Sequence, residues 1–371
     1  MEQAGKLRSD YNGSQDYDLI LRYTDIAKKI IHIPKILYFW RSHKNSTAFY
    51  IDSKLYTINA GKNAIIDHLE RQGISAKVES TKICSLLYRI KYDLIDNPVV
   101  SIIILNKDNI SILKKCIHSI IEKTTYNNYE IIIVENNSIK EETFNYYDEL
   151  KIFNNINIIF WTEKYFNYSI LNNFALQYSN GTHLLFLNND IEIITPGWIE
   201  EMLMYSQRDN VGAVGVKLLF PDNTIQHAGV ILNLHGLAGH IFSRALQNVD
   251  GYMGRLHFVQ NMSVVTAACM MIKKAIFKEV GQFSTEFFAS WSDVDLCLKL
   301  RSAGYLNVWT PHAEAYHHES KTRGYPNTLE KKRIFEQEIT LFKEKWGKVL
   351  EAGDPYYNPN FSLNRSDYSL K

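Results

Sequence analysis

The stretch LLFLNNDIEI (residues 184–193) decides how the rest of the sequence is interpreted. Its apolar beginning predicts a short buried strand. That strand runs into Asn188, Asn189 and Asp190, and isoleucines then resume on either side of Glu192. Two explanations stay open here. Asparagine and aspartate are common in a plain turn, but a carboxylate at the carboxyl end of a central strand also suits a metal ion.

Strands and helices alternate on either side of this stretch. Buried strands are predicted by VVSIIIL, YEIIIVENNS, INIIFW and THLLFLNND, and an amphipathic helix is predicted over residues 167–181. Because parallel strands need crossover connections that cover the sheet, the alternation predicts an α/β fold. We expect a mostly parallel central sheet flanked by helices.

Polar side chains follow three of the predicted strands. In parallel sheets, ligands bind outside the carboxyl ends of the strands. One polar cluster is ordinary turn chemistry, but three at one edge favour a polar ligand over three unrelated turns. The clusters are Asn106, Lys107 and Asp108; Glu135, Asn136 and Asn137; and Asn188, Asn189 and Asp190.

A second group of candidate residues lies in SWSDVDLCLKLRSAGY (residues 290–305). The pattern predicts a helix with Ser292 as its N-cap and Gly304 just beyond its C-terminus. Asp295 fits a capping box with Ser292. Asp293 has no such local role and is free to point into a cleft. The next predicted strand, LNVWTPHAEAYHHES, ends at His317 and His318.

The first 52 residues contain a weak internal repeat. Aligning SQDYDLILR with WSDVDLCLKLR places Asp16 on Asp293, Asp18 on Asp295 and Arg22 on Lys299. A proline follows each first aspartate by the same interval. We interpret residues 1–52 as the C-terminal remnant of a second copy of the same fold, with chance similarity as the alternative. Residues 53–97 are then a helix and connector, 98–350 a complete domain and 351–371 a C-terminal tail.

Composition excludes several classes of protein. The 371 residues contain 41 Lys+Arg and 40 Asp+Glu, so no electrostatic footprint for nucleic acid is expected. The four cysteines are far apart, which argues against a zinc site or disulfide framework. No apolar stretch approaches the length of about 20 residues that a membrane span needs. We expect a soluble cytoplasmic protein, and leave peripheral contact with the inner face of the membrane open.

These motifs, in this order, resemble family 2 glycosyltransferases with the GT-A (nucleotide-diphospho-sugar transferase) fold, from about residue 97 to residue 371. The similarity is to bacterial enzymes of cell-surface polysaccharide and cell-wall synthesis, including rhamnosyltransferase-like proteins in which such domains occur in tandem. It is carried by VSIIILNKDN, YEIIIVENNS, FNYSILNNFALQYSNGTHLLFLNNDIEI, DNTIQHAGV, VVTAACMMIKKAIF, SDVDLCLKLRSAGY and WTPHAEAYHHES.

The resemblance implies a divalent metal site. The DxD motif of the family falls on residues 188–190, so Asp190 would bind Mn²⁺ or Mg²⁺ together with His317. Asn188 replaces the first carboxylate of the motif and takes a position close to the nucleotide-sugar. An amide oxygen still ligates a metal or its water, but it brings less negative charge.

The resemblance also assigns the remaining site residues. Asp293 matches the catalytic base. Glu135 and, more weakly, Asn106 and Asp108 fall where the family binds the nucleobase and ribose. Asn173 falls near the nucleotide.

The expected activity is inverting transfer of a sugar from dTDP-rhamnose or a UDP-sugar to a hydroxyl of a growing polysaccharide. Partners would be the nucleotide-sugar and a glycan or lipid-linked glycan, with no nucleic acid. The N-terminal segment offers a surface for a protein partner or for oligomerisation. The alternative is a GT-A domain without transfer activity that binds glycans or serves in assembly.

Overall fold

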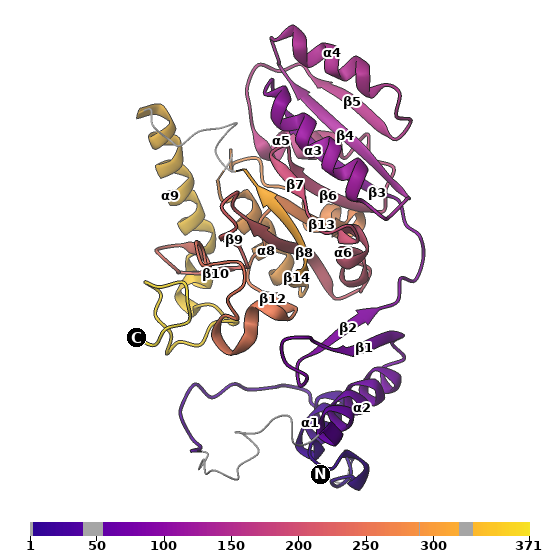
Figure 1. The fold of residues 1–371 in the computed structure, drawn as a ribbon. Helices are drawn as coiled ribbons and strands as arrows, with labels where there is room; N and C mark the ends of the chain where they lie inside the picture. The colour runs from indigo at the N-terminus through magenta and orange to yellow at the C-terminus, as the bar shows by residue number, and fades with distance from the viewer. Residues whose placement is uncertain (1–2, 40–54, 289, 319–328) are drawn as a thin grey trace. The chain divides into compact units, whose positions relative to one another are not determined.

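The computed structural model describes residues 3–39, 55–288, 290–318 and 329–371 (Figure 1). The chain divides into two compact units, Met1–Asp93 and Leu94–Lys371. In the described ranges, no helix is both long enough and apolar enough to cross a membrane.

The described residues of unit 1 form a 3-10 helix, two α-helices and a β-hairpin. Its small core contains Ile65, Leu69 and Val78. The segments that the sequence predicted as a remnant and as a connector form one compact unit, and the origin of the remnant stays a prediction. The elements are η1 (Ser9–Tyr11), α1 (Gln15–Ile26), α2 (Leu55–Arg71), β1 (Ala76–Ser80) and β2 (Tyr88–Tyr92).

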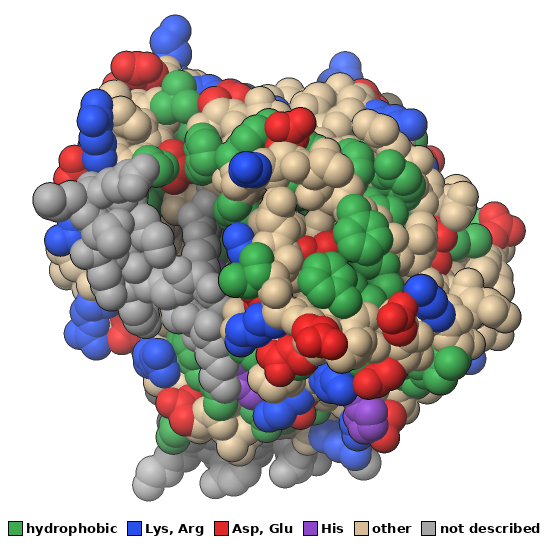
Figure 2. Space-filling view, turned by 90° about the horizontal axis from the view of Figure 1, so that it is seen from above, with side chains coloured by type: hydrophobic (Ala, Val, Ile, Leu, Met, Phe, Trp, Pro, Cys, Tyr) green, Lys and Arg blue, Asp and Glu red, His purple; other side chains and the backbone are tan. Residues whose placement is uncertain are grey.

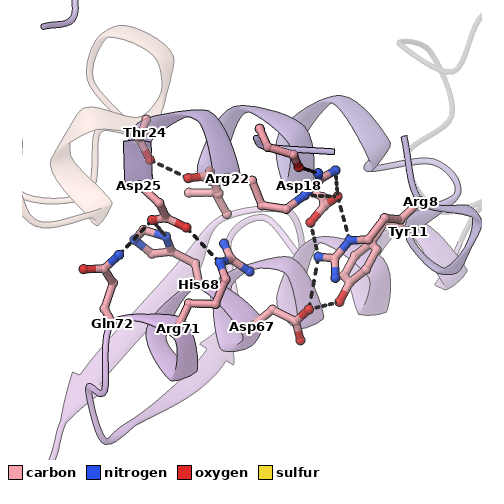
Figure 3. Close-up of polar contacts among 12 residues, drawn as sticks. Arg8, Tyr11, Asp18, Arg22, Thr24, Asp25, Asp67, His68, Arg71 and Gln72 are labelled. Carbon is pink, nitrogen blue, oxygen red and sulfur yellow. Dashed lines mark hydrogen bonds and ion pairs between the residues drawn. The ribbon is translucent and has the colours of Figure 1, made fainter. Parts of the chain in front are cut away.

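Ion pairs join the helices of unit 1 (Figure 3). Asp18 of α1 is fully buried and lies between the guanidinium groups of Arg8 and Arg22. Asp25, the next-to-last residue of α1, accepts hydrogen bonds from the last residue of α2, Arg71, at 2.7 Å and from the following Gln72 at 2.9 Å. The contacts of Asp25 thus join α1 to the end of α2, and the buried Asp18 joins α1 to the segment before η1.

Unit 2 is built on a mixed sheet with the strand order β12-β14-β8-β13-β6-β3-β4-β5. The four strands β6, β3, β4 and β5 are parallel, which confirms the predicted parallel core. Strand β13 enters antiparallel between β6 and β8, and β14 runs parallel to β8. The strands are β3 (Val100–Asn106), β4 (Tyr129–Asn136), β5 (Ile156–Trp161), β6 (His183–Asn188), β8 (Val211–Leu219), β12 (Gln260–Met262), β13 (Cys269–Lys273) and β14 (Leu306–His317).

Shorter strands flank this sheet. Two of them extend it, because β7 pairs with the end of β14 and β9 pairs with β8. Two others form a separate hairpin. They are β7 (Ile191–Ile193), β9 (Ile225–His227), β10 (Val230–Leu232) and β11 (Ala238–His240).

Helices cover both faces of the sheet (Figure 1). Helices α5, α7 and α8 share one core cluster with Ile103, Phe186 and Met270 of the strands. Helix α6 contacts β8, β13 and β14, and α3 contacts β7. The helices of unit 2 are α3 (Ile110–Lys123), α4 (Glu141–Leu150), α5 (Tyr168–Ala175), α6 (Trp198–Ser206), α7 (Lys274–Glu279), α8 (Ser292–Ser302) and α9 (Leu329–Ala352), with the 3-10 segment η3 (Tyr252–His257).

The sequence explains why the central strands are buried on both faces. Strands β3 and β4 are runs of isoleucine and valine, whose β-branched side chains favour the extended backbone. The backbone approaches closely at the entrance to β6, where a Cβ on Gly181 would lie 2.6 Å from the carbonyl oxygen of Val99. A residue without a side chain is therefore required at this position.

The last residues of the chain pack onto unit 2 instead of trailing from it as a tail. Tyr357 and Tyr368 are buried in its main core cluster. The ring of Phe361 lies edge-on to Tyr368, with 5.4 Å between the centroids. The predicted boundary at residue 350 thus divides a segment that the structure joins to the domain.

Candidate active site

The three polar clusters meet at one edge of the sheet, because they follow parallel strands. Asn106 is paired in register with Glu135, and Leu105 with Asn188. The turn after β6 then adds Asn189, whose amide donates to Oδ1 of Asn106 at 2.9 Å. The sequence predicted a polar ligand site because its three clusters were expected to share one edge, and in the structure they do.

Glu135 and Asn106 are satisfied by a buried hydrogen-bond network. Tyr147 of α4 donates to Oε2 of Glu135 at 2.6 Å and accepts from Nδ2 of Asn106 at 2.9 Å. Ser138 donates to the same carboxylate through its hydroxyl and its backbone N–H. Glu135 is 2% exposed, so these donors replace the water it would otherwise need. The network shapes the edge, and a direct contact with a nucleotide stays a prediction.

Asp108 fixes the loop that leads into α4. Its Oδ1 accepts the backbone N–H groups of Ile139 and Lys140, both at 3.0 Å. Its own N–H donates to Oγ of Ser138 at 2.7 Å. Asp108 has a positive φ of 49°, a conformation that aspartate tolerates better than most residues.

Asn173 has a structural role in α5. Its amide nitrogen donates to the carbonyl of Phe283 at 2.9 Å, and its amide oxygen accepts the N–H of the same residue at 3.2 Å. Both ends of the side chain are therefore used, and nothing in this geometry adds to the expected contact with a nucleotide.

Asp190 and His317 come together because the chain reverses after β6. Strand β7 pairs with the end of β14, placing Ile191 opposite His317. Oδ1 of Asp190 lies 3.2 Å from Nε2 of His317, and Nδ2 of Asn188 lies 3.4 Å from the same ring nitrogen. Both Asp190 and His317 are buried.

This group suits a divalent cation that also binds a diphosphate. Oδ1 of Asp190 and Nδ1 of His317 are buried without a hydrogen-bond partner in the described part of the chain. No group of three or more His, Cys, Asp or Glu side chains there could hold a metal by itself. One carboxylate and one imidazole, with the Asn188 amide beside them, leave several positions to substrate oxygens. This is the usual arrangement for Mg²⁺ or Mn²⁺ on nucleotides.

Asp293 is held at the start of α8 by the segment before β13. Its Oδ2 accepts the hydroxyl of Thr266 at 3.0 Å and the N–H of Ala267 at 3.2 Å. The residue before the helix, Trp291, has a left-handed backbone with φ 67°. Such strain in a non-glycine residue clusters at functional sites.

The predicted N-cap of this helix is wrong, whereas Gly304 follows the C-cap residue Ala303 as predicted. Trp291 is the N-cap, and Ser292 is the first residue of α8. Asp295 does not return to the helix N-terminus, because stronger partners hold it in the interior. It accepts Nε1 of Trp346 at 2.9 Å and the hydroxyl of Ser284 at 2.6 Å, and Lys345 lies 2.8 Å away.

The sequence offered His227 as either an acceptor-loop or a packing residue, but it did not predict that His227 pairs with a second histidine, His240. Nδ1 of His227 and Nδ1 of His240 are 3.0 Å apart. Burial lowers the pKa of His240 to about 4, an effect that Asp293 opposes and His317 reinforces. His240 thus lies within electrostatic reach of both the aspartate on α8 and the metal-type group on β14. The motif DNTIQHAGV contains His227, but no sequence signal connects it to His240, which is 13 residues later.

A hollow beside Asp190 is too small to be the whole site. Its volume is about 140 Å³, and its lining includes Ser111, Lys115 and His318. Ligand pockets typically measure about 300–1,000 Å³. A nucleotide-sugar would therefore lie along the open edge of the sheet. Positive and negative side chains are interspersed over the face in Figure 2, in keeping with the balanced composition.

Unit 2 has the predicted GT-A fold. A mannosyltransferase of Pyrobaculum calidifontis, solved with GDP-mannose and Mn²⁺, superposes with a TM-score of 0.50 at 12% identity, covering 81% of this chain and 78% of that one. Residues 101–281 match the family model "Glycosyl transferase family 2". These residues are thus similar to glycosyl transferase family 2, in agreement with the predicted resemblance.

Longer bacterial proteins match the whole chain. It is 41% identical to the uncharacterised protein y4gI of Sinorhizobium fredii and 35% identical to the O-antigen biosynthesis protein RfbC of Myxococcus xanthus, spanning 41% and 28% of their lengths. Over 35% of the chain, it is 28% identical to an N-acetylglucosaminyl-diphospho-decaprenol L-rhamnosyltransferase of Mycobacterium tuberculosis, covering 45% of that protein. The matched region is less than half the length of each of these relatives.

Proposed function

We propose that unit 2 is an inverting glycosyltransferase that moves a sugar from a nucleotide-diphosphate donor to a hydroxyl of a cell-surface glycan. One observation carries this proposal. Asp293 and His317 are both close enough to His240 to affect it electrostatically, and His317 lies 3.2 Å from Asp190. A base and a metal-type pair near one another are what a single displacement at an anomeric carbon requires.

Asp293 is the proposed general base. Inverting displacement needs a group that accepts the proton of the attacking hydroxyl as the new glycosidic bond forms. Thr266 and Ala267 hold one oxygen of the carboxylate, and the N–H of Val294 reaches the other at 2.9 Å. These contacts fix the direction in which the carboxylate points.

Asp190 and His317 are the proposed metal ligands, with Asn188 beside them. A bound Mn²⁺ or Mg²⁺ supplies positive charge where the leaving diphosphate becomes more negative. The network of Asn106, Asp108 and Glu135 would support the nucleoside end of the donor by shaping the edge of the sheet.

The RfbC and rhamnosyltransferase relatives favour dTDP-rhamnose as donor and a glycan or lipid-linked glycan as acceptor, with UDP-hexoses as the alternative. Such a reaction would take place in the cytoplasm. The second candidate function is a binding or assembly module without transfer activity, which is favoured by the amide of Asn188 at a position where a carboxylate would bind metal more strongly.

Nucleotide release from a panel of dTDP-, UDP- and GDP-sugars, measured with and without Mn²⁺ or Mg²⁺, tests the proposal. We expect release from one donor class, loss of release on chelation, and metal-dependent binding of the nucleoside diphosphate by calorimetry. Asp190→Asn should weaken that binding about 10- to 100-fold. Asp209→Asn, a matched control in a fully exposed aspartate, should leave it unchanged. Nucleotide binding without release, for every donor and glycan acceptor, would favour the second candidate.

A further inference from the structure

His227 and His240 form a directed chain of hydrogen bonds with Thr266. The backbone N–H of Thr266 points to Nε2 of His227 at 3.4 Å, and Nδ1 of His227 faces Nδ1 of His240 at 3.0 Å. Thr266 also donates its hydroxyl to Asp293. A single residue thus connects the proposed base with the histidine pair.

The chain of donors fixes the proton on each ring. Burial lowers the pKa of His227 well below its ordinary value and that of His240 to about 4, so both rings are neutral near pH 7. A neutral imidazole carries one N–H and one acceptor nitrogen. Because a backbone N–H can only donate, Nε2 of His227 is the acceptor and Nδ1 carries the proton.

The same logic then applies to His240. Its Nδ1 faces the N–H of His227 and must accept, which leaves the proton of His240 on Nε2. No hydrogen-bond partner for Nε2 is found among the described residues, although Asp293 and His317 are close enough to affect the ring electrostatically. His240 therefore presents a fixed, unused N–H donor beside the proposed base.

The position of the pair indicates which substrate meets this donor. The edge residues expected to support the nucleotide follow β3, β4 and β6. His227 ends β9, which pairs with β8, and β13 separates β8 from β6 in the sheet. His240 contacts His227, so the pair lies by β8, with β13 between it and the strands of the nucleotide edge. If the nucleotide occupies that edge, the second substrate of the transfer is the ligand left for this donor N–H.

We propose that His240 donates a hydrogen bond from Nε2 to an oxygen of the acceptor sugar and that His227 positions it by fixing its tautomer. This inference rests on the proposed function, since it assigns a specificity residue to the same site. The ligand class is a sugar that bears a hydroxyl or carbonyl oxygen next to the attacking hydroxyl.

Two substitutions at His240 separate this role from packing. In His240→Gln the terminal amide reaches about as far as Nε2 and can still donate. In His240→Asn the amide ends at the level of Nδ1. We expect His240→Asn to raise the KM for the acceptor about tenfold, with kcat and the KM for the donor little changed. His240→Gln should stay within about threefold of the wild type.

Steady-state transfer to a glycan acceptor, with nucleotide release in the absence of acceptor as a second readout, tests the inference. Unchanged release without acceptor shows that a variant is folded and binds its donor. His118→Asn is the matched control, because His118 lies on the surface of α3 with 70% of its side chain exposed. An unchanged acceptor KM in His240→Asn, or equal losses in both variants, overturns the inference alone. Absence of release from the wild type overturns the proposed function and this inference with it.

Discussion

Helix α1 of unit 1 and helix α8 of unit 2 each carry an aspartate at the second and at the fourth helical position. The fourth-position aspartates, Asp18 and Asp295, are both fully buried and have a cation one turn later, at Arg22 and Lys299. This agrees with the repeat seen in the sequence, although common descent of the two segments stays a prediction.

The second-position aspartates differ in their surroundings. In both helices, one carboxylate oxygen accepts the N–H of the next residue at 2.9 Å. Asp293 is also held by Thr266 and Ala267, whereas Asp16 is exposed, with no further partner among the described residues. The fourth-position aspartate thus has the same structural role in both helices. The role of the second-position aspartate depends on contacts with segments from elsewhere in the domain.

We expect the largest effect, a loss of transfer rate, at the second-position aspartates, where the two helices should respond differently. Asp293→Asn should lower kcat for transfer about 10²- to 10⁴-fold, because a general base contributes roughly that much. The equivalent Asp16→Asn should leave transfer unchanged. Initial rates of sugar transfer by the two variants, with their thermal unfolding midpoints, measure this. Equal effects of the two substitutions would remove the base assignment.

The same contrast shows what the sequence could and could not predict. Runs such as VSIIIL and YEIIIV predicted their strands because β-branched residues make the pattern local, and the parallel edge followed from their alternation with helices. Ser292 and Asp295 were misassigned because the partners of Asp295, Trp346 and Lys345, are about 50 residues away. Local capping patterns contain no information about such contacts.

The candidate site also has a part that the sequence could predict and a part that it could not. Asp190 and His317 are at strand ends, where the topology alone brings them together. The pairing of His227 with His240 depends on a hairpin in a region without clear periodicity. Likewise, the burial of Glu135 under Tyr147 depends on how α4 packs, which no short motif encodes.

The next largest effect concerns the stability contributed by the fourth-position aspartates, Asp18 and Asp295. Asp18→Asn and Asp295→Asn should each lower the free energy of unfolding by about 2–4 kcal/mol, because each leaves cations without their charged partner. Chemical denaturation of the whole chain, with hydrogen–deuterium exchange of peptides from α1 and α8, would locate each loss. A loss below about 0.5 kcal/mol would show that the burial of these carboxylates is not stabilising.

The stability that Asp18 gives to unit 1 should depend on pH. Burial acts to raise the pKa of Asp18, but hydrogen bonds from Arg8 and Arg22 outweigh it and lower the pKa below its ordinary value. The stabilisation is therefore fully present above about pH 4, the pKa of an unfolded aspartate, and is lost as the pH falls through the lower folded value. Opening of α1, obtained from its exchange rates after correction for the pH dependence of intrinsic amide exchange, should rise on acidification in the wild type and respond less in Asp18→Asn.

The smallest expected effect distinguishes the cations one turn after each buried aspartate. Lys299 lies 3.8 Å from Asp295, which keeps Lys345, Trp346 and Ser284 when the lysine is removed. Lys299→Met should therefore cost less than about 1 kcal/mol, because its pair is long and redundant.

Arg22 should matter more, although it occupies the equivalent position. It contacts Asp18 through both Nε at 3.1 Å and Nη2 at 2.7 Å, and it also donates to the carbonyls of Ala4 and Lys6. Arg22→Met removes a forked pair that no other side chain except Arg8 can replace, at a cost of about 2 kcal/mol. Urea denaturation of the two variants compares them directly. Equal losses would mean that the position along the helix, and not the number of partners around each carboxylate, sets the contribution of the cation.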